Sequence, residues 1–363
     1  MNTEPEATSV EQNHSVLVVG AGIAGLRIAE TLTQQGRDVV VLEARDRVGG
    51  RIVSHAIGSA SFELGPAWFW DGQPRLAALL ARFGIERFEQ FDEGAFCFED
   101  QTGRCTPYRD FPAMPTSMRV VGGFAAVTRQ LAARVDATDL HLSTPVQTLV
   151  LGDDGVTVEA EGRVFTADQV VLAMPPRLIN SLTFQPALPE SFSRSLAAVS
   201  TWMAGQAKCV AVYPTPFWRD AGLSGRGASR LGPLVEIHDA SDERAGRFAL
   251  FGFVGWPPAR RRDEDTLKAA IVDQLRRVFG DEAGDPSALL LKDWATDRWC
   301  ATAADQIPPT THPHYGPAPA LPHDWSRRLI LAGTEFAPHQ GGYVEGALES
   351  AASALARLDA PLD

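Results

Sequence analysis

The sequence predicts an α/β fold built around a parallel sheet, and three features near its start carry this prediction. Residues 16–19 (VLVV) and 39–42 (VVVL) are short runs with no polar residue on either face, which is typical of strands buried in a parallel sheet. Residues 23–32, between these runs, have the apolar spacing of a helix. The glycine pattern GAGIAG occupies residues 20–25, where the first strand would turn into that helix.

The glycine pattern predicts a turn that binds a dinucleotide. Gly20 permits a tight turn, Gly22 lets the backbone approach a pyrophosphate, and Gly25 lets the helix pack closely on the strand. The apolar stripe of this helix consists of Ile23, Leu26, Ala29 and Leu32. Glu43 directly follows the second strand, at the position from which a carboxylate accepts hydrogen bonds from a ribose diol.

A second group of glycines and arginines distinguishes this unit from a nicotinamide site. Arg45, Gly49, Gly50 and Arg51 follow the second strand closely. Their guanidinium and backbone N–H groups would add hydrogen-bond donors to the same pyrophosphate. We therefore expect a long, deeply buried dinucleotide.

Length and composition narrow the class of protein. A chain of 363 residues is long enough for two closely joined domains, and its net charge of −12 argues against a nucleic-acid partner. No apolar run approaches the ~20 residues of a membrane span. The four cysteines lack metal-binding spacing and are expected to be reduced. We expect a soluble, cytoplasmic protein with no membrane partner. Residues 1–13 are expected to form a disordered leader.

The middle of the chain alternates between helix and strand patterns. The helices that apolar spacing predicts cover residues 73–83, 124–135 and 264–279. The predicted strands cover a hairpin over residues 95–108 and the segments 144–150, 156–159, 163–165, 170–173, 208–213, 234–237 and 248–254. The basic run 260–262 is expected to be a solvated helix start. The histidine- and proline-rich residues 306–322 are expected to be a plain loop without metal.

A second informative block lies near the C-terminal end. A short apolar strand over residues 329–332 leads through Gly333 and Glu335 into a loop. Gly341 and Gly342 then precede a helix, so its first N–H groups would stay open. The positive end of the helix dipole would favour a negative charge placed there.

Residues 15–70 and 329–352 together resemble the flavin-containing amine oxidase family, to which the monoamine oxidases belong. The resemblance implies a glutathione-reductase-type, Rossmann-like FAD-binding domain with an inserted substrate domain of mixed α+β structure. The FAD-binding domain would comprise residues 14–72, 140–178 and 296–358, and the substrate domain residues 73–139 and 179–295.

The resemblance also implies which residues hold FAD. Residues 61–70 would pass along the flavin edge, Val146 would contact the adenine side through its backbone, and Glu335 would bind the FAD chain. The helix after Gly342 would point at the flavin ring. The expected FAD-binding residues are Gly20, Gly22, Ala24, Gly25, Glu43, Ala44, Arg45, Gly49, Gly50, Arg51, Gly65, Pro66, Ala67, Trp68, Val146, Gly333, Glu335, Gly342, Tyr343 and Val344.

By the same resemblance, three residues take catalytic roles. Lys208 matches the lysine that holds a water against flavin N5 and assists reoxidation. Tyr343 matches one of two aromatic residues that stand over the flavin, and the second is Trp299 or Trp294, of which we favour Trp299. Cys300 lies where mammalian enzymes attach flavin to cysteine, but it lacks the Ser-Gly-Gly-Cys-Tyr context of that site. We therefore expect non-covalent FAD.

The implied reaction is FAD-dependent amine oxidation. A hydride passes from the amine Cα–H to flavin N5, the imine hydrolyses to an aldehyde, and molecular oxygen reoxidises the flavin to give hydrogen peroxide. An amino-acid substrate would need an arginine for its carboxylate, and Arg75, Arg109 and Arg119 are the candidates. Two alternatives use the same scaffold: a FAD-dependent dehydrogenase or desaturase of a non-amine substrate, and a non-catalytic flavin-binding protein.

Overall fold

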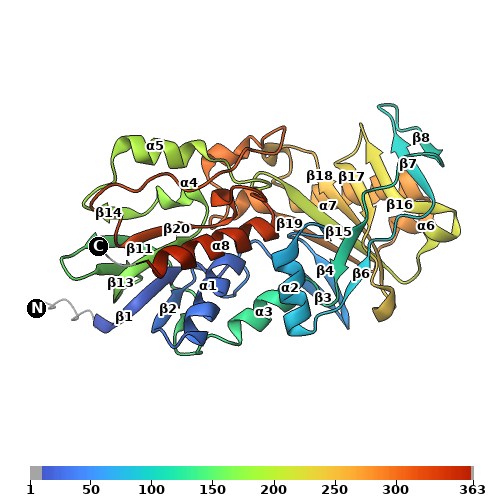
Figure 1. The fold of residues 1–363 in the computed structure, drawn as a ribbon. Coiled ribbons are helices and arrows are strands. Elements are labelled where there is room, and N and C mark those ends of the chain that lie inside the picture. Colours follow the sequence, from blue (N-terminus) through green and yellow to red (C-terminus); the bar gives the residue numbers. More distant parts are fainter. Residues whose placement is uncertain (1–9, 361–363) are drawn as a thin grey trace, which may run out of the picture.

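Two large β-sheets occupy opposite ends of the molecule, with helices packed on their faces (Figure 1). The computed structural model describes residues 10–360. One sheet has eight strands and contains the first glycine-rich unit, and the other has seven. None of the helices within residues 10–360 has the length and apolar character needed to cross a membrane.

The eight-stranded sheet has the order β10-β2-β1-β13-β12-β11-β14, with β20 paired to β13. Its strands are β1 (Val10–Val19), β2 (Val39–Leu42), β10 (Leu140–His141), β11 (Val146–Leu151), β12 (Val156–Ala160), β13 (Arg163–Ala173), β14 (Thr183–Gln185) and β20 (Leu329–Ala332). Strands β1, β2, β13 and β20 run parallel. Residues 16–19 and 39–42 are buried on both sides, which explains their lack of polar side chains.

The start of β1 differs from the sequence prediction. We expected a disordered leader over residues 1–13, of which residues 1–9 lie outside the described residues. Val10 instead begins β1 and pairs with Val164. Pairing with the early part of β13 gives these polar residues ladder partners, so no apolar pattern is needed to order them.

Strand β13 joins two predicted segments, residues 163–165 and 170–173, into one strand. Its first half pairs with β12 and its second half with β20, while β1 lies along its other side. Thr166, Ala167 and Gln169, between the apolar segments, therefore keep strand partners. Periodicity alone does not reveal this change of partner.

Helices cover both faces of the eight-stranded sheet. The α-helices of both halves of the molecule are α1 (Ile23–Gln34), α2 (Pro74–Phe83), α3 (Phe124–Ala132), α4 (Pro176–Ile179), α5 (Glu190–Ala198), α6 (Phe217–Asp220), α7 (Glu264–Phe279) and α8 (Val344–Leu358). Of these, α6 and α7 pack with the seven-stranded sheet. Apolar residues of α1, α2, α3 and α8 form one core with β1 and β2, and α4 and α5 pack over the opposite face (Figure 1). We had assigned α2, α3 and α5 to the substrate domain, but their apolar stripes pack with the sheet that carries the glycine-rich unit.

The seven-stranded sheet has the order β19-β15-β18-β17-β16-β7-β8. Its strands are β7 (Ala95–Glu99), β8 (Cys105–Tyr108), β15 (Ala207–Tyr213), β16 (Leu223–Ser229), β17 (Leu234–Asp239), β18 (Phe248–Val254) and β19 (Ala288–Asp293). Strands β7 and β8 form the predicted hairpin, and the cysteines that flank its turn are free thiols. Helix α7 covers one face with the apolar stripe that its sequence predicted.

Side chains alternate across the two faces of β15. Cys209, Ala211 and Tyr213 pack against α7, whereas Val210 and Val212 pack on the opposite side with residues of β4. Lys208 shares the side of Val210 because strand side chains repeat every second residue. The fold thus turns Lys208 toward the glycine-rich half of the molecule.

Shorter elements complete the structure. Two small sheets contain β3 (Ser54–Ile57) with β4 (Ala60–Glu63), and β6 (Arg87–Glu89) with β9 (Ser117–Val120) and β5 (Phe69–Trp70). The 3₁₀ turns are η1 (Glu243–Ala245), η2 (Pro258–Arg260), η3 (Asp281–Gly284), η4 (Trp294–Thr296), η5 (Ala303–Gln306) and η6 (Thr334–Phe336).

The prediction of a solvated basic run was wrong for Arg261. This guanidinium is buried and bonds both oxygens of Asp293, at 2.7 and 2.8 Å. It also donates to the carbonyls of Gly205 and Trp256, each at 2.7 Å. Arg261 therefore ties the start of α7 to the end of β19, which the neighbouring charges in the sequence do not reveal.

Candidate active site

A cavity of about 860 Å³ lies between the two halves of the molecule. On one side it is lined by the carboxyl ends of β1, β2, β13 and β20 and by the start of α8. On the other side, Lys208 of β15, Glu236 of β17 and Phe253 of β18 reach it. Crevices at the carboxyl ends of parallel strands are the usual place for cofactors in α/β proteins.

The first glycine turn has the geometry that its spacing predicted. Gly20 has φ +104°, a conformation that favours glycine. A Cβ at Gly25 would come within 1.9 Å of the Gly20 carbonyl oxygen, so only glycine lets α1 pack on this turn. A Cβ at Gly22 would meet no atom within 4 Å, because Gly22 faces the cavity.

The second glycine turn lies against the first. Gly49 N donates to the Ala21 carbonyl at 2.8 Å, and Gly22 and Gly49 form a parallel bridge. A Cβ at Gly50 would lie 3.3 Å from Gly22 Cα. Both turns line the cavity. Because their glycines carry no side chains, the two turns form a cradle whose backbone a pyrophosphate can approach.

Glu43 is held at the edge of this cradle by backbone donors. Its carboxylate accepts hydrogen bonds from Ala21 N at 2.8 Å and from Arg45 N at 2.9 Å. Each bond occupies only part of the capacity of an oxygen, so the carboxylate can still accept from a ligand hydroxyl.

The arginines of the first block have protein partners. Arg45 pairs with Asp297 at 2.6 Å, and the same carboxylate accepts from Trp299 N at 3.1 Å. Arg45 therefore connects the first block to the segment that carries Trp299. Arg51 forms a bidentate pair with Glu335, at 2.5 and 3.1 Å.

Most of the expected site residues line this one cavity. Lys208, Tyr343 and Trp299 are among them. The two that do not line it are Gly25, which packs α1 on the first turn, and Glu335, which is buried behind Arg51.

Lys208 is a buried cation, and few polar or charged groups offset the free-energy cost of its burial. Its Nζ donates to the Gly65 carbonyl at 2.6 Å and lies 5.0 Å from the Phe253 ring centre and 5.6 Å from that of Phe251. Burial lowers the pKa of Lys208 to about 8, although the carboxylates of Glu63 and Glu236 act in the opposite direction. A lysine with a pKa near neutrality can exchange protons during a reaction.

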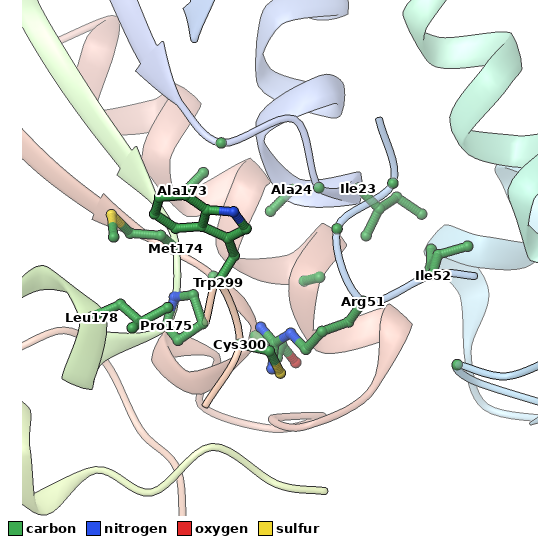
Figure 2. A pocket seen from close by; sticks show the side chains of 18 of the residues that line it. Ile23, Ala24, Arg51, Ile52, Ala173, Met174, Pro175, Leu178, Trp299 and Cys300 are labelled. Atoms are coloured by element: carbon green, nitrogen blue, oxygen red, sulfur yellow. The ribbon is translucent and has the colours of Figure 1, made fainter. Parts of the chain in front are cut away.

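Aromatic rings surround Tyr343. Its ring is edge-on to Trp70 at 5.9 Å and stacks on the His312 imidazole at 5.2 Å with an interplanar angle of 6°. Trp299 projects into the cavity (Figure 2). Trp294, the other candidate for the second wall, is 3% exposed and donates its indole N–H to the Leu64 carbonyl at 2.9 Å. This bond fixes Trp294 as a packing residue at the cavity margin.

The loop over residues 306–322 contributes more than its sequence indicated. Described residues form no metal-binding group of His, Cys, Asp or Glu. His312 and Tyr315 instead pack on the start of α8, where a Cβ at Gly342 would meet His312 Nε2 at 2.7 Å and a Cβ at Gly341 would meet Tyr315 Cβ at 2.4 Å. These two glycines are therefore also required by ring packing.

The arginine candidates for an amino-acid carboxylate lie outside the cavity lining. Arg75 pairs with Glu345 at 3.2 Å, and Arg119 donates to the Ser241 carbonyl at 2.7 Å. Arg109 is exposed on the surface.

Several lining residues were missed by the sequence analysis, including Trp202, Glu236 and Phe253. They come from segments without a motif, and the fold alone brings them to the cavity. The alternation of strand β18 was the one available signal, since it places Phe253 on the same face as Phe251.

Comparison with known proteins gives a consistent result. The sequence profile of the family described as "Flavin containing amine oxidoreductase" matches residues 23–119 and 108–358. Putrescine oxidase of Kocuria rosea is 27% identical over 407 residues, which cover 80% of this chain and 84% of that protein. A putative flavin-containing monoamine oxidase, AofH of Mycobacterium tuberculosis, is 27% identical over 454 residues, with coverage of 96% and 97%.

Solved structures share the fold. The chain superimposes on putrescine oxidase bound to putrescine with a TM-score of 0.77 at 24% identity, covering 96% of this chain and 99% of the other. For cyclohexylamine oxidase from Brevibacterium oxydans the TM-score is 0.81 at 21% identity, with the same coverage. The predicted α/β fold with a Rossmann-like cofactor domain is confirmed.

Proposed function

The chain belongs to the family of flavin-containing amine oxidoreductases, and from this membership and the cavity geometry we propose that it binds FAD non-covalently and oxidises an amine to an imine. One observation carries the proposal. The open glycine cradle and the buried Lys208 line the same cavity, so a cofactor held by the cradle would extend toward the lysine and the aromatic residues.

The residues around the cradle fit FAD. The two glycine turns would hold the pyrophosphate through backbone N–H groups, and Glu43 would accept from the ribose diol. Val146, which lines the cavity, would contact the adenine side, and the start of α8 would face the ring. A cavity of about 860 Å³ lies in the upper part of the usual ~300–1,000 Å³ range for ligand sites.

When bound, FAD supplies a two-electron acceptor that takes a hydride from the amine carbon and passes the electrons to oxygen as hydrogen peroxide. Tyr343 and Trp299 would confine the amine. Their apolar surfaces favour the neutral amine, whose lone pair would stabilise the iminium formed as the hydride leaves. The iminium would then lose an N–H proton to water and become the imine. Lys208 would hold a water through its remaining donors and assist reoxidation. Water would then hydrolyse the imine to an aldehyde, and the nitrogen would leave as ammonia.

The environment of Cys300 supports non-covalent attachment. Its side chain is buried, and burial raises the pKa of the Cys300 thiol to about 11. A protonated thiol is a poor nucleophile, so Cys300 is poorly suited to form a covalent bond to a flavin ring. A desaturase or a non-catalytic flavin protein would use the same scaffold, but neither alternative gives a role to Lys208 beside the aromatic residues.

Two measurements on the purified protein test the proposal. Denaturation followed by filtration should release all flavin into the filtrate, where chromatography identifies it as FAD. Flavin retained on the polypeptide would contradict non-covalent binding, and a different flavin would contradict the cofactor assignment. During turnover with an amine, peroxide and aldehyde should then form in equal amounts. Aldehyde without peroxide would show that another acceptor replaces oxygen.

A further inference from the structure

One row of side chains crosses the cavity face of the seven-stranded sheet. Lys208 of β15 pairs directly with Phe253 of β18, and Phe253 pairs directly with Glu236 of β17. Directly paired residues of antiparallel strands point to the same face, so all three side chains project together, and all three line the cavity. Two strand spacings separate the Cα atoms of Lys208 and Glu236, a distance of about 10 Å.

Glu236 is held in place by His238, two residues along the same strand. His238 Nε2 and Glu236 Oε1 are 2.6 Å apart, and the imidazole is buried against the Trp68 ring at 5.1 Å. The Glu236 side chain is 56% exposed. One carboxylate oxygen is therefore fixed by His238, while the other remains accessible from the cavity.

The two neighbouring cations, Arg226 and Lys208, donate their hydrogen bonds to groups other than this second carboxylate oxygen of Glu236. Arg226 is near enough to interact with Glu236 through space, but its guanidinium bonds Asp92 Oδ2 at 3.2 Å and the Pro112 carbonyl at 3.1 Å. Lys208 donates to the Gly65 carbonyl instead. The far end of the row thus offers a negative charge with unused hydrogen-bonding capacity.

We propose that Glu236, oriented by His238, binds a second cationic nitrogen of the substrate, so that the cavity selects short aliphatic diamines over monoamines of equal length. This inference rests on the proposed amine oxidation. The alkyl chain would lie over Phe253, with the reacting nitrogen toward Lys208 and the distal ammonium at Glu236. A substrate carboxylate would be repelled by the same group.

The rival explanation is that Glu236 serves as a counter-charge for Lys208. The two explanations differ in what they predict for a monoamine. Removing a counter-charge alone would change the oxidation of diamines and monoamines equally, whereas removing a binding group for the distal ammonium would lower the oxidation of diamines more than that of monoamines.

The experiment compares the flavin-loaded wild type with Glu236→Gln. Gln keeps the size of the side chain and can still bond His238. Values of kcat/KM are measured for 1,4-diaminobutane against n-butylamine, and for 1,5-diaminopentane against n-pentylamine. The control is Glu93→Gln, which removes an exposed carboxylate outside the cavity lining.

In the wild type we expect each diamine to exceed its matched monoamine by about 10- to 100-fold, the range for a hydrogen bond to a charged group. Glu236→Gln should abolish this preference by lowering kcat/KM for the diamines about 10- to 100-fold more than for the monoamines, while Glu93→Gln keeps the preference. A wild type without preference, or an equal loss for both amines in Glu236→Gln, overturns the proposal.

A binding measurement separates this inference from the proposed function. Calorimetry compares 1,4-diguanidinobutane with 1-guanidinobutane, a dication and a monocation that need not react. Tighter binding of the dication, lost in Glu236→Gln, supports the role of Glu236 even if no amine reduces the flavin. Equal binding of both compounds by the wild type contradicts it.

Discussion

Replacing Lys208 with methionine should stabilise the fold at neutral pH and slow flavin reoxidation. The pKa of Lys208 falls from 10.5 to about 8 because the side chain is buried, and at about 1.4 kcal/mol per pH unit this difference amounts to about 3 kcal/mol. Methionine also loses the hydrogen bond to the Gly65 carbonyl, which contributes about 1 kcal/mol. The variant should therefore be more stable than the wild type by about 2 kcal/mol at pH 7.

The stability difference between Lys208→Met and the wild type depends on pH. Below pH 8 the lysine is charged in both states, and the full penalty of burial is present. Between pH 8 and 10.5 the unfolded chain binds a proton that the folded chain has lost, so the stability of the wild type rises with pH. Above pH 10.5 the lysine is neutral in both states, so the free-energy cost of burying its charge is gone. The advantage of Lys208→Met should thus shrink from pH 7 to pH 10.

Urea unfolding of the flavin-free proteins at several pH values measures this difference. Lys268→Met, on the outer side of α7, is the matched control and should stay within about 0.5 kcal/mol of the wild type throughout. A difference between Lys208→Met and the wild type that stays constant from pH 7 to 10 would refute the reasoning.

The same variant tests the role of the lysine in the reaction. Lys208→Met should retain FAD, and after anaerobic reduction it should be reoxidised by oxygenated buffer more slowly than the wild type. Stopped-flow absorbance follows the return of the flavin band. Unchanged reoxidation would remove Lys208 from the mechanism.

Three further substitutions separate binding from stability. Gly22→Val should fold, because its side chain meets open cavity, yet bind no FAD; a folded variant with a full flavin spectrum would contradict the cradle assignment. Gly25→Val should lose about 3 kcal/mol of stability in urea unfolding, since its Cβ would meet the Gly20 carbonyl, and wild-type stability would be inconsistent with that contact. Arg261→Met should lose about 3–5 kcal/mol by leaving Asp293 unpaired, and a Tm decrease below about 2 °C would argue against it.

The glycine-rich unit could be predicted from sequence because its constraints are local. Gly20 needs a positive φ and Gly25 leaves no room for a Cβ, and both requirements arise within a few residues of chain. Helix α7 was predicted with its observed bounds for a similar reason, since its apolar stripe and the Asp263 cap are encoded in consecutive residues.

Contacts between distant segments could not be predicted in this way. Arg261 carries the local signature of a solvated residue, but Asp293 and two carbonyls from other segments bury it. Glu236 belongs to a strand without a motif, and only its register with Phe253 and Lys208 brings it to the cavity. The apolar stripe of α2 likewise does not specify which core it joins, and in the structure it packs with β1 and β2.

The central claim is that an amine reduces a flavin held in this cavity. The most direct test is the visible absorption spectrum of the purified protein without oxygen, before and after addition of primary amines, diamines and amino acids. The account predicts an oxidised flavin band that at least one amine bleaches, with recovery when oxygen is admitted. A flavin band that no amine bleaches, or a protein that takes up no flavin, would contradict it.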